Sequence, residues 1–457
     1  MAKRFKNKKL YWLLAITVIL VTSGFKCGAP PAGLTPGKPE SITLNYWKVW
    51  EDSFNISELV ELYQKEHPHI AISYRNLTAE EYENELLRAF AEDRGPDIFS
   101  INTTWMRAYQ TLIQPLPPEI KIQYVIQKGT IKKETFTELR TLKTLTLRDV
   151  KSLYPDVVYD NQVIDSQIYG LPLSIDTLAL YYNRDLLNNA GITSPPKTWD
   201  EFRSQVSQLT KLDLKGNVIQ AGAAIGTADN VARAADILSL LMMQDGTVMT
   251  DSRGFATFDK VPENYNRAVK PSVEALNFYT SFASPAKQSY TWNVKMPNSL
   301  QAFMSGSVAF FFGYAYHLPI IKAQAPKLNF EITEVPQVGN PVNFASYWAE
   351  TVSKKSKHLD EAWDFILFIT ANSENNKKFL ERSQKPTALR MLIDAQKDDL
   401  ELAPFANQLI SSRSWYKGKN ASAAEKIFNS MINDDILGNL PTANIIDLGV
   451  NKINQTL

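Results

Sequence analysis

The sequence predicts an α/β protein built on open, mostly parallel sheets, and three observations lead to this fold class. β-prone runs at 41–47, 70–74 and 97–101 alternate with helix-patterned runs at 56–66 and 78–92, an order typical of a parallel sheet. A chain of 457 residues is long enough for two or three domains with sizeable cores. Its 44% apolar and 21% charged residues are ordinary for a globular protein.

Local signals support each of these first elements. The strand at 41–47 alternates polar and apolar β-formers, and the helix that follows is stopped by Pro68. The second helix opens on Thr78-Ala-Glu-Glu81, the pattern of a capping box. Gly95-Pro96 then turns the chain into the third strand. Ligands of such sheets bind beyond the carboxyl ends of the strands.

The N-terminus has the composition of an export signal. Residues 1–26 hold six basic residues and no acid, and their apolar run of 12 residues from Leu10 is shorter than the roughly 20 of a membrane span. Cys27, the only cysteine, follows this run and cannot form an internal disulfide. We expect cleavage before Cys27 and a lipid on its thiol. Gly24 and Lys26 depart from the usual lipoprotein signal, and an uncleaved anchor is the alternative.

Both outcomes tether the protein outside the cytoplasmic membrane. Residues 27–40 are rich in Pro, Gly and Ala and are expected to form a flexible tether. Outside residues 1–26 the chain has 43 basic and 48 acidic residues. This acidic balance argues against a nucleic-acid partner, which requires a basic surface.

A β-prone run from Leu173 to Tyr182 contains a single acid, Asp176. Such a run reads as a strand that is buried on both faces. An acid there is costly to bury unless it bonds to a polar group. Asp176 is therefore either an acid at a strand end that faces water, or a carboxylate that faces a cleft and binds a polar ligand.

This region resembles a known family. Pro172-Leu-Ser, Ala179-Leu-Tyr-Tyr-Asn183, Leu187 and Asn189 are similar to the signature of bacterial extracellular solute-binding proteins of the maltose-binding type, the receptors of ABC importers. A second block, Phe303 to Gly313, resembles another recurring segment of that family. The resemblance implies two α/β lobes joined by crossing strands, with the ligand closed between the lobes.

The resemblance also implies the division of the chain. Lobe 1 is expected to comprise residues 41–172 and 347–393, and lobe 2 residues 173–346 and 394–457. The stretch at about 115–166 looks longer than in the family and is interpreted as an insertion on lobe 1. Further elements are expected as helices at 198–211, 232–244, 271–282, 299–304 and 359–369, and strands at 221–225, 306–313, 330–335 and 346–352.

Aromatic residues at strand ends and in loops are the candidates for ligand contact, because ring faces stack on the apolar face of sugars. Asp176 would bond to hydroxyl groups. Some of these rings are expected to serve only as core. The candidate ligand-binding residues are Trp47, Trp50, Trp105, Asp176, Trp292, Tyr314, Tyr316 and Trp348.

No convincing catalytic set, metal site or cofactor motif is recognised, so a binding protein is expected rather than an enzyme. Three interpretations stay open: a carbohydrate receptor of an ABC importer, the same fold with another ligand, or a surface glycoside hydrolase. Tyr181-Tyr182 is similar to the tyrosine pair of ferric-ion receptors, but adjacent strand residues face opposite sides. The expected partners are a small sugar or oligosaccharide and the permease subunits, and the protein itself is expected to be a monomer.

Overall fold

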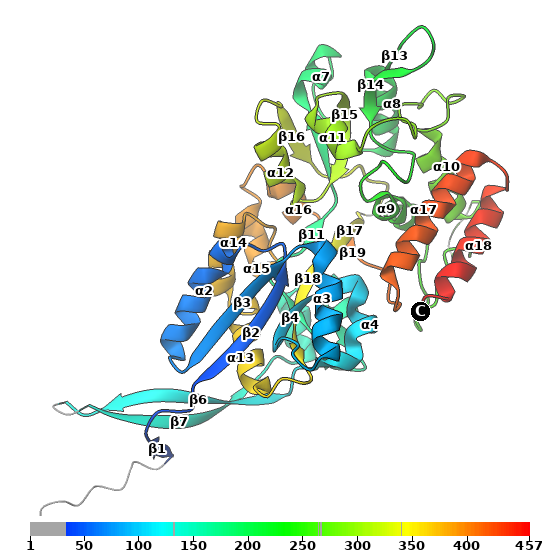
Figure 1. Cartoon of the computed structure of the whole chain (residues 1–457). Helices are drawn as coiled ribbons and strands as arrows, with labels where there is room; N and C mark the ends of the chain where they lie inside the picture. The colour runs from blue at the N-terminus through cyan, green and yellow to red at the C-terminus, as the bar shows by residue number, and fades with distance from the viewer. Residues whose placement is uncertain (1–32, 131–132, 264, 266, 340) are drawn as a thin grey trace, which may run out of the picture.

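The structure, a computed structural model, describes residues 33–130, 133–263, 265, 267–339 and 341–457. It has two α/β lobes with a small sheet between them (Figure 1). The predicted signal peptide and Cys27 lie outside the described residues. Within the described ranges, no helix combines the length and the apolar character needed to cross a membrane.

Lobe 1 is built on a six-stranded sheet. Its strands lie in the order β10 (Leu171–Pro172), β18 (Trp348–Ser353), β4 (Ile98–Asn102), β2 (Ile42–Val49) and β3 (Ile70–Leu77), with β5 (Ile113–Gln114) also paired to β18. The two faces of β2 enter different cores, because successive side chains point to opposite sides. Leu44 and Tyr46 pack in one hydrophobic cluster, whereas Trp47 and Val49 pack in another.

Helices cover both faces of this sheet. The helical segments of lobe 1 are α2 (Ser53–Glu66), α3 (Ala79–Ala91), α4 (Met106–Tyr109), α5 (Leu147–Leu153), α6 (Asp156–Gln162), α13 (Leu359–Thr370), α14 (Ser373–Ser383) and α15 (Arg390–Gln396), with 3-10 turns at Thr103–Trp105 and Gln110–Leu112. Asp52 caps α2, since its carboxylate accepts from the N–H of Phe54 at 2.8 Å.

Lobe 2 has a five-stranded sheet in the order β13 (Lys211–Leu212), β14 (Val218–Ala223), β15 (Val308–Gly313), β12 (Ala179–Asn183) and β16 (Phe330–Thr333). Its helices are α7 (Arg184–Asn189), α8 (Trp199–Leu209), α9 (Ala234–Gln244), α10 (Pro271–Ser281), α11 (Ser299–Met304), α12 (His317–Gln324), α16 (Ala403–Ala406), α17 (Ala421–Leu437) and α18 (Thr442–Asn454). The predicted capping box of α8 forms in full between Thr198 and Glu201.

The expectation of mostly parallel sheets is wrong in detail, because both sheets are mixed. In these two sheets, among the described residues, the parallel pairs are β2 with β3, β2 with β4, and β14 with β15. β18 and β12 pair antiparallel to β4 and β15. These two strands carry the chain from one lobe into the other. Each of them begins at the sheet edge that faces the other lobe. β4 and β15 end at that same edge, so the crossing strands run antiparallel to them.

The connections between the lobes form the small central sheet of β11 (Asp176–Thr177), β17 (Asn343–Ser346) and β19 (Ser412–Arg413). The chain leaves lobe 1 through β10, passes β11 and enters lobe 2 in β12. It returns through β17 and β18. The last return leads through α16 and the residues that follow it, where Phe405 packs in a lobe 2 cluster and Leu409 in a lobe 1 cluster, so the predicted bound at 393 stays a prediction.

The predicted insertion contains a long antiparallel hairpin, β6 (Glu119–Lys128) and β7 (Glu134–Lys143), followed by α5, α6 and the short strands β8 (Val163–Ile164) and β9 (Gln167–Ile168). The expectation of a flexible tether over 27–40 needs correction at one point. Leu34–Pro36 forms β1 and pairs with β7. The edge of β7 that faces away from β6 has free backbone groups, and this short segment pairs with them. The pairing forms although residues 27–40 are rich in Pro.

Candidate functional site

The two lobes meet where strands of both sheets end. Trp50 follows β2 of lobe 1 and Tyr316 follows β15 of lobe 2, and their ring centroids are 6.0 Å apart. Trp50 is 55% exposed and has a left-handed backbone with φ 54°. Such a backbone is unusual for a large residue and persists only where the surroundings impose it. Trp50 and Tyr316 therefore bring an aromatic ring from each lobe together at the junction of the lobes.

Other residues of lobe 2 support the ring of Tyr316. Its ring stacks on that of Tyr314 at 5.7 Å and 15°. Tyr314 is fully buried, and its hydroxyl donates to Asp236 Oδ2 at 2.7 Å. Asp236 in turn accepts from the Arg233 guanidinium at 2.8 and 3.0 Å. Tyr314 thus supports the half-buried Tyr316 ring and offers no surface of its own.

Asp176 lies in β11, at the junction of the lobes. Its Oδ1 accepts from the N–H of Ala315 at 2.9 Å, and its Oδ2 from the N–H of Tyr316 at 3.3 Å. The carboxylate therefore fixes the loop that carries Tyr316. Burial raises the pKa of Asp176 from its ordinary 3.8 to about 7, although these backbone bonds and the charge of Lys385 oppose the rise.

Glu51, the residue after Trp50, takes part in an ion pair. Lys385, which precedes α15, forms an ion pair with the buried Glu51 of the loop after β2. Asn55 also donates to Glu51 Oε1 at 2.8 Å. The Lys385 charge also lowers the pKa of Asp176, against the effect of burial. Polar groups of this kind next to an aromatic ring suit a ligand with many hydroxyls.

Trp105 and Trp348 are half-buried and belong to one aromatic group of lobe 1. Their centroids are 5.3 Å apart in an edge-to-face arrangement. Trp105 stacks on Tyr109 at 6.0 Å, and Trp348 meets the edge of Tyr82 at 5.7 Å. Both tryptophans keep part of their surface exposed, so either can contact a ligand.

The remaining candidates are packed as core. Trp292 has no exposed surface, and its Nε1–H donates to Asn230 Oδ1 at 3.2 Å. Trp47 is 8% exposed and carries the Arg75 guanidinium over its ring at 4.6 Å. In this conformation Trp292 and Trp47 offer no ring face to a ligand, since each is buried on the inner side of its lobe.

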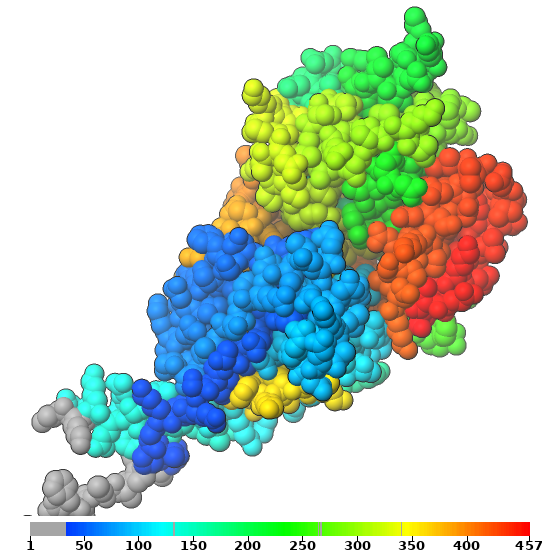
Figure 2. Space-filling view, viewed as in Figure 1, coloured from blue at the N-terminus to red at the C-terminus, as the bar shows by residue number. Residues whose placement is uncertain are grey.

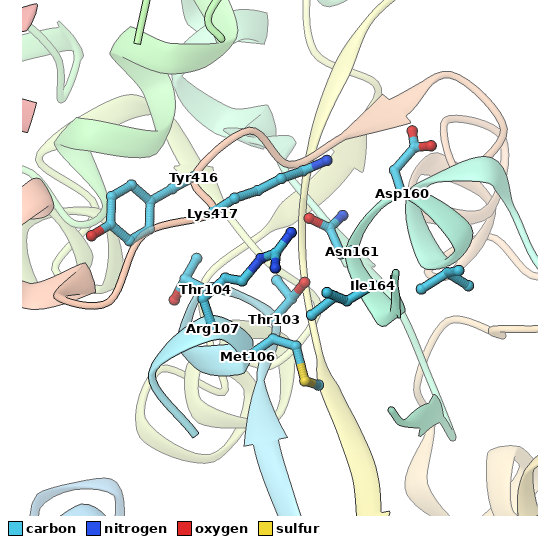
Figure 3. Close-up of a pocket in the computed structure, with 10 residues that line it drawn as sticks. Thr103, Thr104, Met106, Arg107, Asp160, Asn161, Ile164, Tyr416 and Lys417 are labelled. Carbon is cyan, nitrogen blue, oxygen red and sulfur yellow. The ribbon is translucent and has the colours of Figure 1, made fainter. Parts of the chain in front are cut away.

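A cavity of about 60 Å³ bridges the lobes (Figure 3). Lobe 1 contributes Thr103, Thr104, Met106, Arg107, Asp160, Asn161, Val163 and Ile164, and lobe 2 contributes Tyr416 and Lys417. Lys417 extends from lobe 2 toward Asn161, with the Arg107 guanidinium beside it. Burial lowers the pKa of Lys417, and Asp160 opposes this change. The space accommodates a few waters or one polar substituent of a ligand.

Sequence reasoning missed the basic residues of this site, Arg233, Lys385 and Lys417, because no pattern in the sequence links these separate charges to a ligand. Only Arg233 carries a structural signal, since its φ of 59° is left-handed at the start of α9. Such a backbone cannot be read from sequence, because Arg has no preference for it.

Other ligand chemistries find less support. The hydroxyl of Tyr181 donates to Tyr314 O at 2.7 Å inside lobe 2, whereas that of Tyr182 bonds to Glu331. The two hydroxyls thus have separate protein partners and do not converge on one ion. Across the described ranges, no three His, Cys, Asp or Glu side chains are grouped so that they could hold a metal.

The charge of Asp176 makes the stability of the protein depend on pH. An acid with a higher pKa in the folded than in the unfolded state binds more protons when folded, so the free energy of unfolding should fall as pH rises from about 4 to about 7. The slope for one proton is at most about 1.4 kcal/mol per pH unit. Urea unfolding of wild type and Asp176→Asn over this range should show a flatter profile for the variant. Identical slopes would contradict this assignment.

Comparison with known proteins agrees with this architecture. The sequence model of the family described as bacterial extracellular solute-binding protein matches residues 58–397. A probable ABC transporter-binding protein of Deinococcus radiodurans is 25% identical over 58% of this chain and 62% of its own length. The galactooligosaccharide-binding protein of Bacillus subtilis is 23% identical over 80% of this chain and 77% of its own.

Solved structures share the fold. The sugar-binding protein MalE from Xanthomonas citri superposes with a TM-score of 0.69 and 18% identity, over 91% of this chain and 97% of the other. At this identity the likeness establishes the two-lobed fold. The family match covers well over half of the residues. The chain therefore belongs to the family of bacterial extracellular solute-binding proteins.

Proposed function

We propose that this protein is the extracytoplasmic receptor of an ABC importer and that it captures a small carbohydrate between its lobes. The observation that carries the proposal is the pairing of Trp50 and Tyr316 across the lobes, next to Asp176 and the Glu51–Lys385 pair. Aromatic faces stack on the apolar side of a sugar ring, and carboxylate, ammonium and amide groups bond to its hydroxyls. The sugar-binding names of the relatives support the same ligand class.

In this mechanism the lobes rotate about the central sheet. The ligand enters an open cleft, the ring platforms of the two lobes approach each other around it, and the closed form docks on the permease subunits. The closed state is favoured only by the contacts that the ligand makes with both lobes at once. Trp50 on lobe 1 and Tyr316 on lobe 2 would provide such contacts, with Asp176 at the junction between them.

We also propose that the chain is a lipoprotein anchored through Cys27. The basic start, the short apolar run and the position of the only cysteine support this. The lipid would keep the receptor near its permease, where a tether raises the effective concentration for docking. An uncleaved N-terminal anchor would have the same consequence.

The test of the carbohydrate proposal is a native mass spectrum of gently purified protein, followed by calorimetry. We expect a retained ligand with the mass of a mono- or oligosaccharide, and saturable binding of that sugar. Galacto-oligosaccharides and maltodextrins are the first compounds to titrate. A retained ligand without hydroxyl groups, or no binding across the sugar panel, would contradict the proposal. Release of reducing sugar from polysaccharides would instead favour a glycoside hydrolase.

A further inference from the structure

The hairpin β6–β7 is the part of lobe 1 that the proposed receptor function does not use. Its ten residue pairs run from Glu119↔Lys143 to Lys128↔Glu134 without a register shift. Ten residues of antiparallel strand span about 34 Å. Figures 1 and 2 show the hairpin projecting from the end of lobe 1 that lies away from lobe 2. We call β6, β7 and the paired β1 the arm.

The arm is firmly joined to lobe 1 at its base. Ile120 and Ile122 are buried in the lobe 1 core. The N–H of Lys121 donates to Asp360 Oδ2 at 3.0 Å, at the start of α13. Further along, the Tyr124 ring lies 4.9 Å from that of His67. These contacts make the arm move with lobe 1.

Within the arm, β1 pairs with β7 close to the first residues that the structure describes. Leu34 pairs with Glu138. The N–H of Gly37 donates to Thr135 O, and the Thr137 hydroxyl donates to Gly37 O, both at 3.0 Å. Leu34 is therefore already attached to β7 before the chain reaches lobe 1.

This pairing shortens the link to the predicted anchor. Six residues lie between Cys27 and Leu34, so the two can be at most about 25 Å apart. A tether that ran freely to Ile42 would reach about 50 Å. If the lipid is on Cys27, the middle of the arm must stay within about 25 Å of the lipid headgroups. This limit lets the arm reach the membrane surface more readily than a free tether would.

The charge of the arm is opposite to that of the body. Residues 119–143 contain six basic and three acidic residues, although acids outnumber bases in the chain beyond residue 26. Lys128 and Lys133 are exposed near the tip of the hairpin. Neither forms an ion pair with another described residue. Exposed lysines close to an anionic lipid surface are attracted to it.

We propose that the arm is a membrane-docking element that lies on an anionic phospholipid surface. The inference rests on the proposed anchoring of the receptor. With the arm on the bilayer, lobe 1 is held at a fixed orientation and lobe 2 is the lobe that moves when ligand binds. The attraction is electrostatic, so it weakens as salt is raised.

The test places a fluorophore at the tip of the arm in the full-length, membrane-extracted protein. Thr130→Cys supplies the thiol, because a lipidated Cys27 is blocked. The protein is reconstituted into vesicles of phosphatidylcholine with phosphatidylglycerol that contain a headgroup spin-label as quencher. We expect quenching at this position and none at Leu214→Cys, a fully exposed site in the turn between β13 and β14 of lobe 2. Equal quenching at the two sites would overturn the proposal, and so would none at either.

Charge reversal provides the matched comparison. Lys128→Glu with Lys133→Glu should abolish the quenching at the tip, as should high salt or vesicles of phosphatidylcholine alone. Lys215→Glu in lobe 2 should leave it unchanged. Quenching that survives the reversal on these vesicles would overturn the electrostatic docking.

Two measurements on the same samples separate this inference from the function on which it rests. Flotation of wild type and Cys27→Ser reports the anchor, since loss of the lipid should release the protein from vesicles. Calorimetry with sugar reports the receptor function and should not respond to the arm variants. A protein that floats and binds sugar while its tip label stays unquenched contradicts the arm alone.

Discussion

Tyr316→Ala should weaken ligand binding about 10- to 100-fold, which corresponds to the roughly 1–3 kcal/mol of a stacked ring. The Tyr316 ring faces Trp50 across the lobes at 6.0 Å. Its other face rests on Tyr314, so the ring cannot easily turn away. Its loss removes the platform of lobe 2 and one of the contacts that favour the closed state. Calorimetry with the sugar found by native mass spectrometry is the measurement.

Two control variants keep this experiment interpretable. Phe255→Ala removes a 45% exposed ring of lobe 2 in a turn before α10, and should leave affinity unchanged. Tyr314→Phe keeps the supporting ring but loses the bond to Asp236, so it should reduce stability more than affinity. If Tyr316→Ala binds like wild type and still folds, the ligand lies elsewhere, with the cavity at Lys417 as the next place to search.

Site residues that lie next to predicted strands could be recognised from the sequence. Trp50 is predicted because it follows a strand whose carboxyl end faces the ligand in open sheets, and Tyr316 because it follows the block at 303–313 that resembles the family. The structure brings these two rings together. Asp176 was recognised because an acid within an apolar strand needs polar partners, and it has them in the N–H groups of Ala315 and Tyr316. Contact of these residues with ligand stays a prediction.

The orientation of side chains could not be predicted in the same way. Tyr314 and Tyr316 are two residues apart and follow the same strand, yet one is 1% exposed and the other half-buried. The difference comes from Asp236, which accepts from the Tyr314 hydroxyl and lies far away in sequence. Trp292 is likewise buried through Asn230. Partners of this kind are a property of tertiary packing, which local patterns do not contain.

The sequence of β6 contains a strand pattern. Ile120, Ile122, Tyr124 and Ile126 recur at every second position, as expected for a strand with one covered face. The greater length of this stretch than in the family predicts an insertion but not a hairpin. The pairing of β1 with β7 had no such signal, because Leu34–Pro36 is too short to show a period.

Glu350→Ala should lower the free energy of unfolding by about 3–5 kcal/mol, the largest change expected for any single substitution considered, because it leaves a buried charge without its partner. Glu350 in β18 is fully buried and forms an ion pair with Lys48 of β2, which is 5% exposed. Ser100, on the strand between them, donates to Glu350 Oε2 at 2.6 Å. Without Glu350, the Lys48 ammonium keeps only Ser100, at 3.5 Å. Urea unfolding is the measurement.

Replacing Lys48, Ser100 and Glu350 together should lower the free energy of unfolding less than replacing Glu350 alone. Lys48→Met, Ser100→Ala and Glu350→Leu together replace the charges by apolar groups of similar volume, and should recover most of the loss. Glu401→Ala breaks the exposed pair with Lys322 and should cost no more than about 1 kcal/mol. A loss for Glu350→Ala as small as that for Glu401→Ala would mean that water reaches Lys48 in lobe 1.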